Sequence, residues 1–443
     1  SVPILAQAWL GSLQAQATVP AAQPPAAGME PWPRGHRPQG RRGVPPRWWR
    51  CLCACALPLA AGGEARPASY IRTVYVEYTD TPAGHFEFGR SVGEAVGDAI
   101  RAAWASDKEL AAMEEWAATD ATGRRVFESF VQGSNASFPL YTREVEGMAV
   151  GSQVPLRRLL VNQLREELSQ FLPETVGWRK RRGKCTDAFA YDPSSGVAAW
   201  GHNDDWSVNW RNASYMVLAT ALAEDGSVKL KFGSWFYPGY LPGMDIAFNS
   251  HGVAYTVNSL FPRAFHSSGV GTAWVARHLL EATSMEDAVA RAADARVSTA
   301  MSYNIGDVRG KRMAQLEADS RGRHGLWHVT GPYFHANLFR HLETPQFSEA
   351  SSDHRTARWE QLRPSTVEGL RQFLSDTQDP EWPVYRNARA PDDCYTEVTG
   401  LFDLERGTLS VWNSPAAASP PLATFDLSFG AAAEAGAAQL VYA

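Results

Sequence analysis

The stretch RKRRGKCTDAFAY, residues 179–191, places a cysteine where a basic, glycine-containing loop enters a predicted strand. The strand begins after Cys185 in CTDAFAYD and is followed by a second one in GVAAWGHNDDW, residues 196–206. A thiol at such an entry point is expected to be exposed. Five neighbouring cations favour its thiolate form, namely Arg179, Lys180, Arg181, Arg182 and Lys184. We therefore expect Cys185 to be a nucleophile with a lowered thiol pKa.

Other interpretations of this segment are a structural cysteine, a solvated basic loop or a site for trypsin-like cleavage. Cys185 and Cys394 stand apart from a cluster at Cys51, Cys53 and Cys55, so the two could pair. Five cysteines in this arrangement do not indicate a disulfide framework. A loop open to proteolysis also suits a bond that the protein itself breaks.

Two further polar positions are expected at the ends of strands. Asn203, Asp204 and Asp205 come after an apolar run, although an Asn-Asp-Asp run alone is more typical of a turn or a cap. In LPGMDIAFNSHGVAYTVNSL, residues 241–260, Asn258 lies at the end of an apolar strand. A side-chain amide there is suited to stabilising an oxyanion, because it is a neutral donor.

The rest of the chain alternates between helical and extended patterns. A strand at 69–80 is followed by a turn at Gly84, and a closing hairpin is expected at 396–415. Residues 185–260 form a strand meander. Apolar spacing predicts helices over 88–118, 124–133, 154–172, 272–282, 285–295 and about 356–375, and further strands over 300–308, 312–319 and 325–331. We therefore expect one α+β domain over residues 67–443, with antiparallel sheets covered by helices.

Residues 1–66 are predicted to be a low-complexity leader. From Met29, an arginine-rich stretch precedes an apolar run from Leu52 to Ala61, which is the layout of a secretory signal. The run is too short to span a membrane in the mature protein. A disordered leader or a transit peptide are the alternatives. A secretory route would make Asn135-Ala-Ser and Asn212-Ala-Ser glycosylation acceptors and would place the protein outside the cell or in a lysosome-like lumen.

Composition and missing motifs exclude several classes of function. The net charge is −5 and no long basic stripe follows residue 66, so nucleic acid is not an expected partner. Paired CxxC motifs, an HExxH helix and a phosphate-binding GxxxxGK[ST] loop are absent. We therefore expect neither a metal nor a cofactor.

The ordered motifs CTD, GHNDDW and LPG…N..G…T.NSL resemble the isopenicillin N acyltransferase family of N-terminal-nucleophile hydrolases, most of all its insect N-β-alanyl-dopamine and carcinine hydrolase branch. The resemblance covers roughly residues 70 to 415. It implies a four-layer αββα fold with two packed, mostly antiparallel sheets. It also implies self-cleavage between Lys184 and Cys185 into an α-chain and a β-chain that stay together. Penicillin-type members have glycine before the cysteine, whereas here Gly183 lies one residue earlier.

The same resemblance assigns site residues. Asp205 matches the family's aspartate, Asn258 its oxyanion asparagine, and Arg355 its late arginine, with Arg358 close enough to compete. We expect Trp206, Tyr237 and Gly243 to contact substrate, although aromatic residues on strands more often pack in a core.

These assignments predict an amidohydrolase that cleaves small N-acyl amines, such as β-alanyl amines, through a thioester on Cys185. Self-cleavage would release an α-amino group whose ordinary pKa lies near 8, so that the nucleophile and its base belong to one residue. An acyltransferase that uses a thioester donor is one alternative, and an uncleaved, inactive binding glycoprotein is another. A Cys–His dyad is disfavoured because none of His202, His251, His335 and His354 lies in a thiol-protease signature, so each is expected at the surface or satisfied in the core.

Overall fold

The structure is a computed structural model that describes residues 70–172, 185–294, 296–320, 322–429 and 439–442. All of these residues lie in one compact unit, Glu64–Ala443. The predicted leader, residues 1–66, lies outside the described residues. Among the described helices, none is both long enough and apolar enough to cross a membrane.

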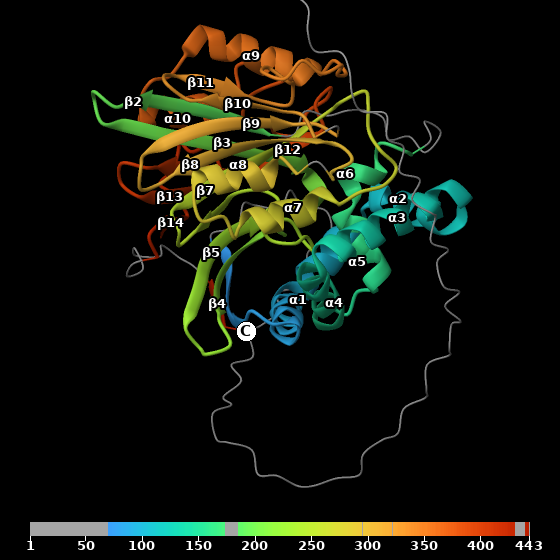
Figure 1. Ribbon diagram of the computed structural model, residues 1–443. Coiled ribbons are helices and arrows are strands. Elements are labelled where there is room, and N and C mark those ends of the chain that lie inside the picture. Colours follow the sequence, from blue (N-terminus) through green and yellow to red (C-terminus); the bar gives the residue numbers. More distant parts are fainter. Residues whose placement is uncertain (1–69, 173–184, 295, 321, 430–438, 443) are drawn as a thin grey trace, which may run out of the picture. The chain divides into compact units, whose positions relative to one another are not determined.

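Two β-sheets form the centre of this unit (Figure 1). The first has nine strands, in the order β10 (His324–His328), β9 (Arg312–Ala318), β8 (Ala300–Asp307), β7 (Val253–Leu260), β6 (Ala247–Asn249), β5 (Val228–Phe236), β4 (Tyr215–Leu222), β1 (Arg72–Thr79) and β15 (Gln439–Tyr442). The second has six, in the order β11 (Tyr333–His335), β2 (Thr186–Asp192), β3 (Val197–Ser207), β12 (Cys394–Asp403), β13 (Thr408–Trp412) and β14 (Ala423–Asp426). All recorded strand pairs are antiparallel except those of β1 with β4 and β15.

Helices cover the outer face of each sheet. The nine-stranded sheet is covered by α1 (Pro82–Ala105), α2 (Lys108–Thr119), α3 (Ala121–Ser137), α4 (Pro139–Ser152), α5 (Leu156–Gln163), α6 (Arg165–Leu168), α7 (Thr272–Leu279) and α8 (Met285–Ala292). The six-stranded sheet is covered by α9 (Ala350–Leu362) and α10 (Val367–Leu374). A short 3₁₀ helix, Val208–Trp210, follows β3.

Three clusters of buried side chains hold these layers together. Between the sheets, Trp200 of β3 stacks on Phe402 of β12 at a ring-centroid distance of 4.1 Å and packs with Met216 and Phe248 of the facing sheet. A larger cluster joins the nine-stranded sheet to α1–α8, and a smaller one joins β2 and β3 to α9 and α10. The predicted four-layer αββα architecture is therefore confirmed.

The predicted helix boundaries are wrong in several places, because polar caps and proline divide the apolar patterns. Asp107 and Asp120 accept hydrogen bonds from the first turns of α2 and α3, so the stretch after α1 forms separate helices. Gly84 lies in the first turn of α1 and does not form a turn before it. The helix expected at 154–172 is divided at Leu164, and the one expected at 356–375 is divided ahead of Pro364.

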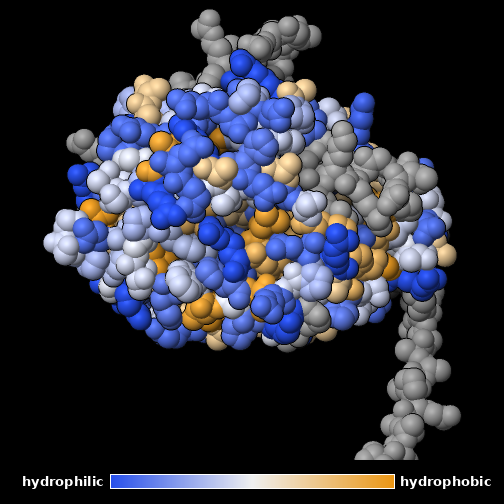
Figure 2. All heavy atoms as spheres, turned by 90° about the horizontal axis from the view of Figure 1, so that it is seen from above, coloured by the Kyte–Doolittle hydropathy of each residue, from blue (hydrophilic) through white to orange (hydrophobic). Residues whose placement is uncertain are grey.

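Figure 2 shows one face of the molecule, on which hydrophilic residues predominate and hydrophobic residues form small areas between them. Large hydrophobic side chains such as Val150, Val228 and Trp327 are exposed on separate elements. Scattered apolar residues of this kind are usual on a folded protein and indicate no particular partner.

Candidate active site

Cys185 is the residue immediately before β2, and it is buried, with 5% of its surface exposed. Burial raises the pKa of its thiol to about 12, while a hydrogen bond and charge from His202 act in the opposite direction. The prediction of an exposed cysteine with a lowered pKa is therefore wrong for the environment that the structure describes. The basic residues on which it depended, and Lys184 with the predicted scissile bond, lie outside the described residues.

The three polar residues expected after a strand lie inside one. Asn203, Asp204 and Asp205 belong to β3 and pair with Thr399, Val398 and Thr396 of β12. Because side chains alternate along a strand, His202 and Asp204 point to one face and Asn203 and Asp205 to the other. The loop interpretation of HNDDW was wrong because all these residues are buried in the sheet.

His202 lies between two carboxylates. Its Nδ1 is 2.8 Å from Oδ2 of Asp187 on β2, and its Nε2 is 3.0 Å from Oδ1 of Asp245, which follows β5. Burial alone would lower the pKa of His202, but these two carboxylates raise it well above its ordinary value. His202 is therefore a core histidine satisfied by Asp187, one of the two environments that the sequence predicted, and it lies next to the thiol.

Asp204 is the carboxylate that the Cys185 thiol contacts. The Cys185 thiol donates a hydrogen bond to Oδ1 of Asp204 over 4.0 Å, and the hydroxyl of Tyr237 donates to the same oxygen. Burial raises the pKa of Asp204 well above its ordinary value, and the nearby Asp245 raises it further. The Asp204 carboxyl therefore keeps its proton at pH values where a free aspartate has lost it.

The side chain of Asp205 points to the opposite face of β3 from that of Asp204, and it contacts the neighbouring strand β12. Its Oδ1 accepts a hydrogen bond of 2.5 Å from the hydroxyl of Thr396, and its Oδ2 is 3.8 Å from Nη1 of Arg386. Burial raises the pKa of Asp205 to about 7, against the charges of Arg386 and Arg355. The described partners of Asp205 are thus Thr396 and Arg386 and not the thiol.

Arg355, on α9, holds the backbone at Cys185. Its Nη1 donates to the carbonyl oxygen of Cys185 over 2.6 Å and to the hydroxyl of Thr186 over 2.7 Å. Its Nη2 donates to Oδ1 of Asn337 over 2.9 Å. Arg358, one turn along, pairs instead with Asp376 at 2.6 Å and is partly exposed. Of the two arginines, Arg355 is therefore the one at the site.

Asn258 lies on β7, on the same face as Thr256. Its Oδ1 accepts a hydrogen bond of 2.7 Å from Asn304, while its Nδ2 is buried and has no hydrogen-bond partner in the described part of the chain. Thr256 donates to Asp187, the partner of His202, over 2.6 Å. Asn304 also donates to the hydroxyl of Thr256, so it connects Asn258 through Thr256 and Asp187 to the Cys185 cluster, and Asn258 offers a donor hydrogen.

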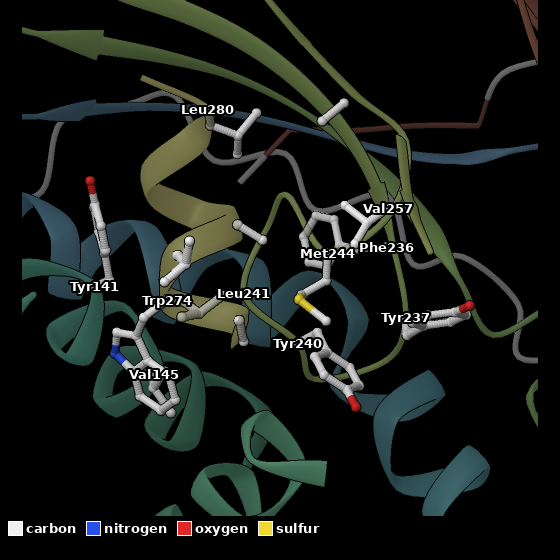
Figure 3. Packing of buried hydrophobic residues seen from close by; sticks show 14 of the residues in the cluster. Tyr141, Val145, Phe236, Tyr237, Tyr240, Leu241, Met244, Val257, Trp274 and Leu280 are labelled. Carbon is white, nitrogen blue, oxygen red and sulfur yellow. The ribbon is translucent and has the colours of Figure 1, made fainter. Parts of the chain in front are cut away.

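A small cavity of about 20 Å³ opens beside the thiol. Aromatic and apolar side chains form most of its wall, and Figure 3 shows four of them near the turn after β5: Tyr237, Tyr240, Met244 and Val257. The predicted contacts Trp206 and Tyr237 line this cavity, and two carboxylates, Glu166 and Asp245, lie among them. The rings of Trp206 and Tyr237 pack 5.4 Å apart, so these residues serve core and cavity together.

Gly243 does not line this cavity. Its φ of +103° is a conformation that glycine adopts readily, and an added Cβ would lie 2.5 Å from the carbonyl oxygen of Ala276. Its N–H donates to the hydroxyl of Ser234 over 2.9 Å. Gly243 therefore allows the LPG turn to pack against α7, so that its neighbours Met244 and Asp245 reach the cavity.

The remaining predicted residues lie away from the thiol. Asn135 is exposed on α3, and Asn212 is exposed just before β4. Cys185 and Cys394 are both outside any disulfide. Side-chain atoms of Cys185, His202 and Asp204 lie within 4.8 Å of one another, as do those of Asp392, Asp393 and Cys394.

Sequence reasoning did not identify Asp187, Asp245, Arg386 and Glu166. One signal was available, because CTD and GHND place Cys185 with Asp187 and His202 with Asp204 at the two-residue spacing of a strand. Asp245, Arg386 and Glu166 come from distant segments, and nothing local distinguishes them.

Comparison with known proteins gives the family. The sequence profile of the acyl-coenzyme A:6-aminopenicillanic acid acyl-transferase family matches residues 193–415. The chain belongs to this family. Its match begins after Cys185, so the predicted nucleophile lies outside the matched residues. This is the family that the ordered motifs resemble.

One relative of this acyl-transferase family member is the β-alanyl-dopamine/carcinine hydrolase of Drosophila melanogaster. The two are 23% identical over 371 residues, an alignment that covers 77% of this chain and 93% of the relative. Homology of this extent makes an amide hydrolase or acyltransferase the general class of the protein.

Two solved structures are also similar to this family member. They are a mutant and a variant of the conjugated bile acid hydrolase from Clostridium perfringens, with 11% and 12% identity and TM-scores of 0.33 and 0.32. They cover 58% and 51% of this chain, and 98% and 89% of the solved chains. TM-scores this low support no further structural argument.

Proposed function

We propose that the protein is a self-processing amidohydrolase whose nucleophile is Cys185. One observation carries this proposal. Cys185 stands directly ahead of β2, with its thiol beside a cavity and its carbonyl held by Arg355. In an acyl-transferase family chain, this is the arrangement that a cysteine needs to become the first residue of a β-chain. Cleavage at Lys184–Cys185 would turn the amide nitrogen of Cys185 into an α-amine.

In turnover, that α-amine takes the thiol proton, and the sulfur attacks the substrate carbonyl. The amine product leaves with the proton, and water then hydrolyses the thioester. Asn258 donates to the tetrahedral oxyanion through Nδ2, which is buried and has no partner among the described residues. Asp205 acts on the site through the charge of Arg355, which holds the carbonyl of Cys185.

Intact mass and N-terminal sequencing of the purified wild-type chain test the proposal. The expected result is two fragments, one of which begins at Cys185. A single uncleaved chain would contradict self-processing and would favour the inactive binding glycoprotein. An N-terminus at any other residue would contradict the assignment of the nucleophile.

The acyl group is proposed to be small and to carry a positive charge, like the β-alanyl group in the relative's name. Glu166 and Asp245 in the wall of the cavity are suited to an ammonium group. Tyr237, Tyr240 and Trp206 present ring faces that also attract cations.

Glu166→Gln is expected to raise KM for a β-alanyl amide about 10-fold, because one charge-assisted hydrogen bond to the ammonium becomes a weaker neutral one. The control is a propionyl amide of the same amine, which has the same length and no ammonium. Its kinetics should not change. Equal losses on both substrates would show that Glu166 acts on the fold and not on the acyl group.

Asn258→Ala is expected to lower kcat by about 10²-fold to 10³-fold, the range measured when one oxyanion donor is removed. Steady-state rates with the same β-alanyl amide provide the measurement. Asn304→Ala is the matched control, because Asn304 donates to Oδ1 of Asn258 and to the hydroxyl of Thr256 and leaves Nδ2 of Asn258 in place, so it should cost less. A loss in KM alone, with kcat unchanged, would contradict the oxyanion role.

Acyl transfer is a second candidate, and the family's own description as an acyl-transferase favours it. Both reactions share the thioester and differ in whether water or an amine attacks it. Adding a primary amine during turnover distinguishes them. A new amide formed in proportion to the amine, at the expense of free acid, would identify a transferase.

We also propose a secreted or lysosome-like location with glycans on Asn135 and Asn212, both of which are exposed. Digestion with an N-glycosidase should lower the mass of the protein expressed in a secretory host. An unchanged mass would contradict glycosylation at both sites.

A further inference from the structure

Self-cleavage faces a difficulty that later turnover does not. In the uncleaved chain the nitrogen of Cys185 is part of a peptide bond, so it cannot act as the base. Burial raises the pKa of the thiol well above its ordinary value, so little thiolate forms at neutral pH. The first cleavage therefore needs a side chain that removes the thiol proton.

Two side chains of β3 lie within reach of the sulfur. Sγ of Cys185, a ring nitrogen of His202 and a carboxylate oxygen of Asp204 all lie within 4.8 Å of one another. The thiol already donates to Oδ1 of Asp204 over 4.0 Å, and Oδ2 of that carboxylate is buried without a hydrogen-bond partner among the described residues. His202 is held on its other side by Asp187, at 2.8 Å.

We propose that Asp204 accepts the thiol proton of Cys185 in the uncleaved chain, and that His202 supplies the positive charge that stabilises the thiolate. The proposal rests on the self-processing proposed above. It gives Asp204 and His202 roles that the α-amine cannot fill before cleavage.

The step balances as an N-to-S acyl shift. The proton moves from Sγ to Asp204, and the sulfur bonds to the carbonyl carbon of Lys184. As the carbon–nitrogen bond breaks, the nitrogen of Cys185 takes the proton back from Asp204. Water then hydrolyses the thioester, which leaves a carboxylate on Lys184 and a free thiol and amine on Cys185.

The surroundings of Asp204 suit this role. Cys185, His202, Tyr237 and Asp245 are the ionisable groups that face it, and Asp187 faces His202. Burial and Asp245 raise the pKa of Asp204, which brings a weak base closer to the strength that a thiol requires. Because Asp204 must be ionised to accept a proton, cleavage should speed up with rising pH and then level off once this carboxyl has ionised.

Asp204→Asn tests the proposal, since it keeps the shape and an acceptor oxygen but cannot take a proton. The full chain is made by cell-free synthesis with a radioactive label, and loss of the uncleaved band is followed from pH 6 to pH 10. We expect cleavage at pH 7 to be slower by about 10²-fold or more. The rate should then rise about 10-fold per pH unit without a plateau, because hydroxide alone ionises the thiol below its pKa.

Three variants act as controls. Asp225→Asn makes the same change in an exposed turn and should cleave at the wild-type rate. Asp204→Glu restores a carboxylate and should restore the plateau. His202→Gln removes the charge and should lower the rate while keeping the plateau.

The outcomes separate the two proposals. A wild-type chain that never cleaves overturns self-processing, and this inference with it. If the wild-type chain cleaves and the Asp204→Asn variant cleaves at the same rate, only the role of Asp204 is overturned. A variant that is slowed by the same factor at every pH, or never cleaves, also overturns that role, because Asp204 would then only support the fold.

Discussion

Cys185→Ala is expected to remain one uncleaved chain and to hydrolyse no N-acyl amine. Removal of the sulfur removes both the group that attacks the Lys184 carbonyl and the group that carries the acyl intermediate. Residual activity should therefore equal the uncatalysed rate. Intact mass and a hydrolysis assay on the same preparation measure both losses.

Cys394→Ala is the matched control for this variant. Cys394 is also outside any disulfide, is equally buried at 5% exposure, and has a pKa that burial raises to about 11. The two substitutions remove the same atom from similar surroundings, so packing losses should be similar. A Cys394→Ala chain that cleaves and turns over normally would assign the chemistry to Cys185. If Cys394→Ala fails equally, the loss reflects packing, and the nucleophile assignment has no support.

Strand patterns in the sequence predicted the central sheets well. The segments at 72–79, 186–192 and 253–260 are dense in β-branched, aromatic and small apolar residues, and all three are strands. Helix breaks were predicted less well, since Asp107 interrupts an apolar pattern over 88–118 that otherwise continues at helical spacing. A capping side chain decides these boundaries, and apolar spacing does not record it.

The site was predicted in part. Motif order placed Cys185, Asn258 and Arg355 in one region, and the structure puts the guanidinium of Arg355 on the carbonyl of Cys185. The protonation of the site was not predicted, because it depends on burial and on Asp245, which lies 60 positions from Cys185 in the sequence. A run of lysine and arginine beside a cysteine says nothing about the dielectric that the folded sheets create.

Arg355→Met is expected to destabilise the fold by about 3 kcal/mol and to slow self-cleavage. The guanidinium is fully buried, so its loss leaves the Cys185 carbonyl, the Thr186 hydroxyl and Oδ1 of Asn337 without this donor. Glu349, 3.6 Å away, also loses its cation. Unfolding is measured by urea in a Cys185→Ala background, where both variants stay as one chain and their midpoints can be compared.

Arg358→Met is the control for Arg355→Met, because it removes a positive charge that lies on the same helix, α9, but away from the site. Arg358 is partly exposed and paired with Asp376, so its loss should cost 1 kcal/mol or less and leave cleavage unchanged. Arg355→Lys keeps a positive charge but cannot contact Cys185, Thr186 and Asn337 in the same fixed geometry. If the lysine variant is as stable as wild type yet cleaves slowly, Arg355 acts by positioning the Cys185 carbonyl. If Arg355→Met and Arg358→Met are equally mild, the buried contacts of Arg355 contribute little, and the late arginine of the family has no positioning role in this chain.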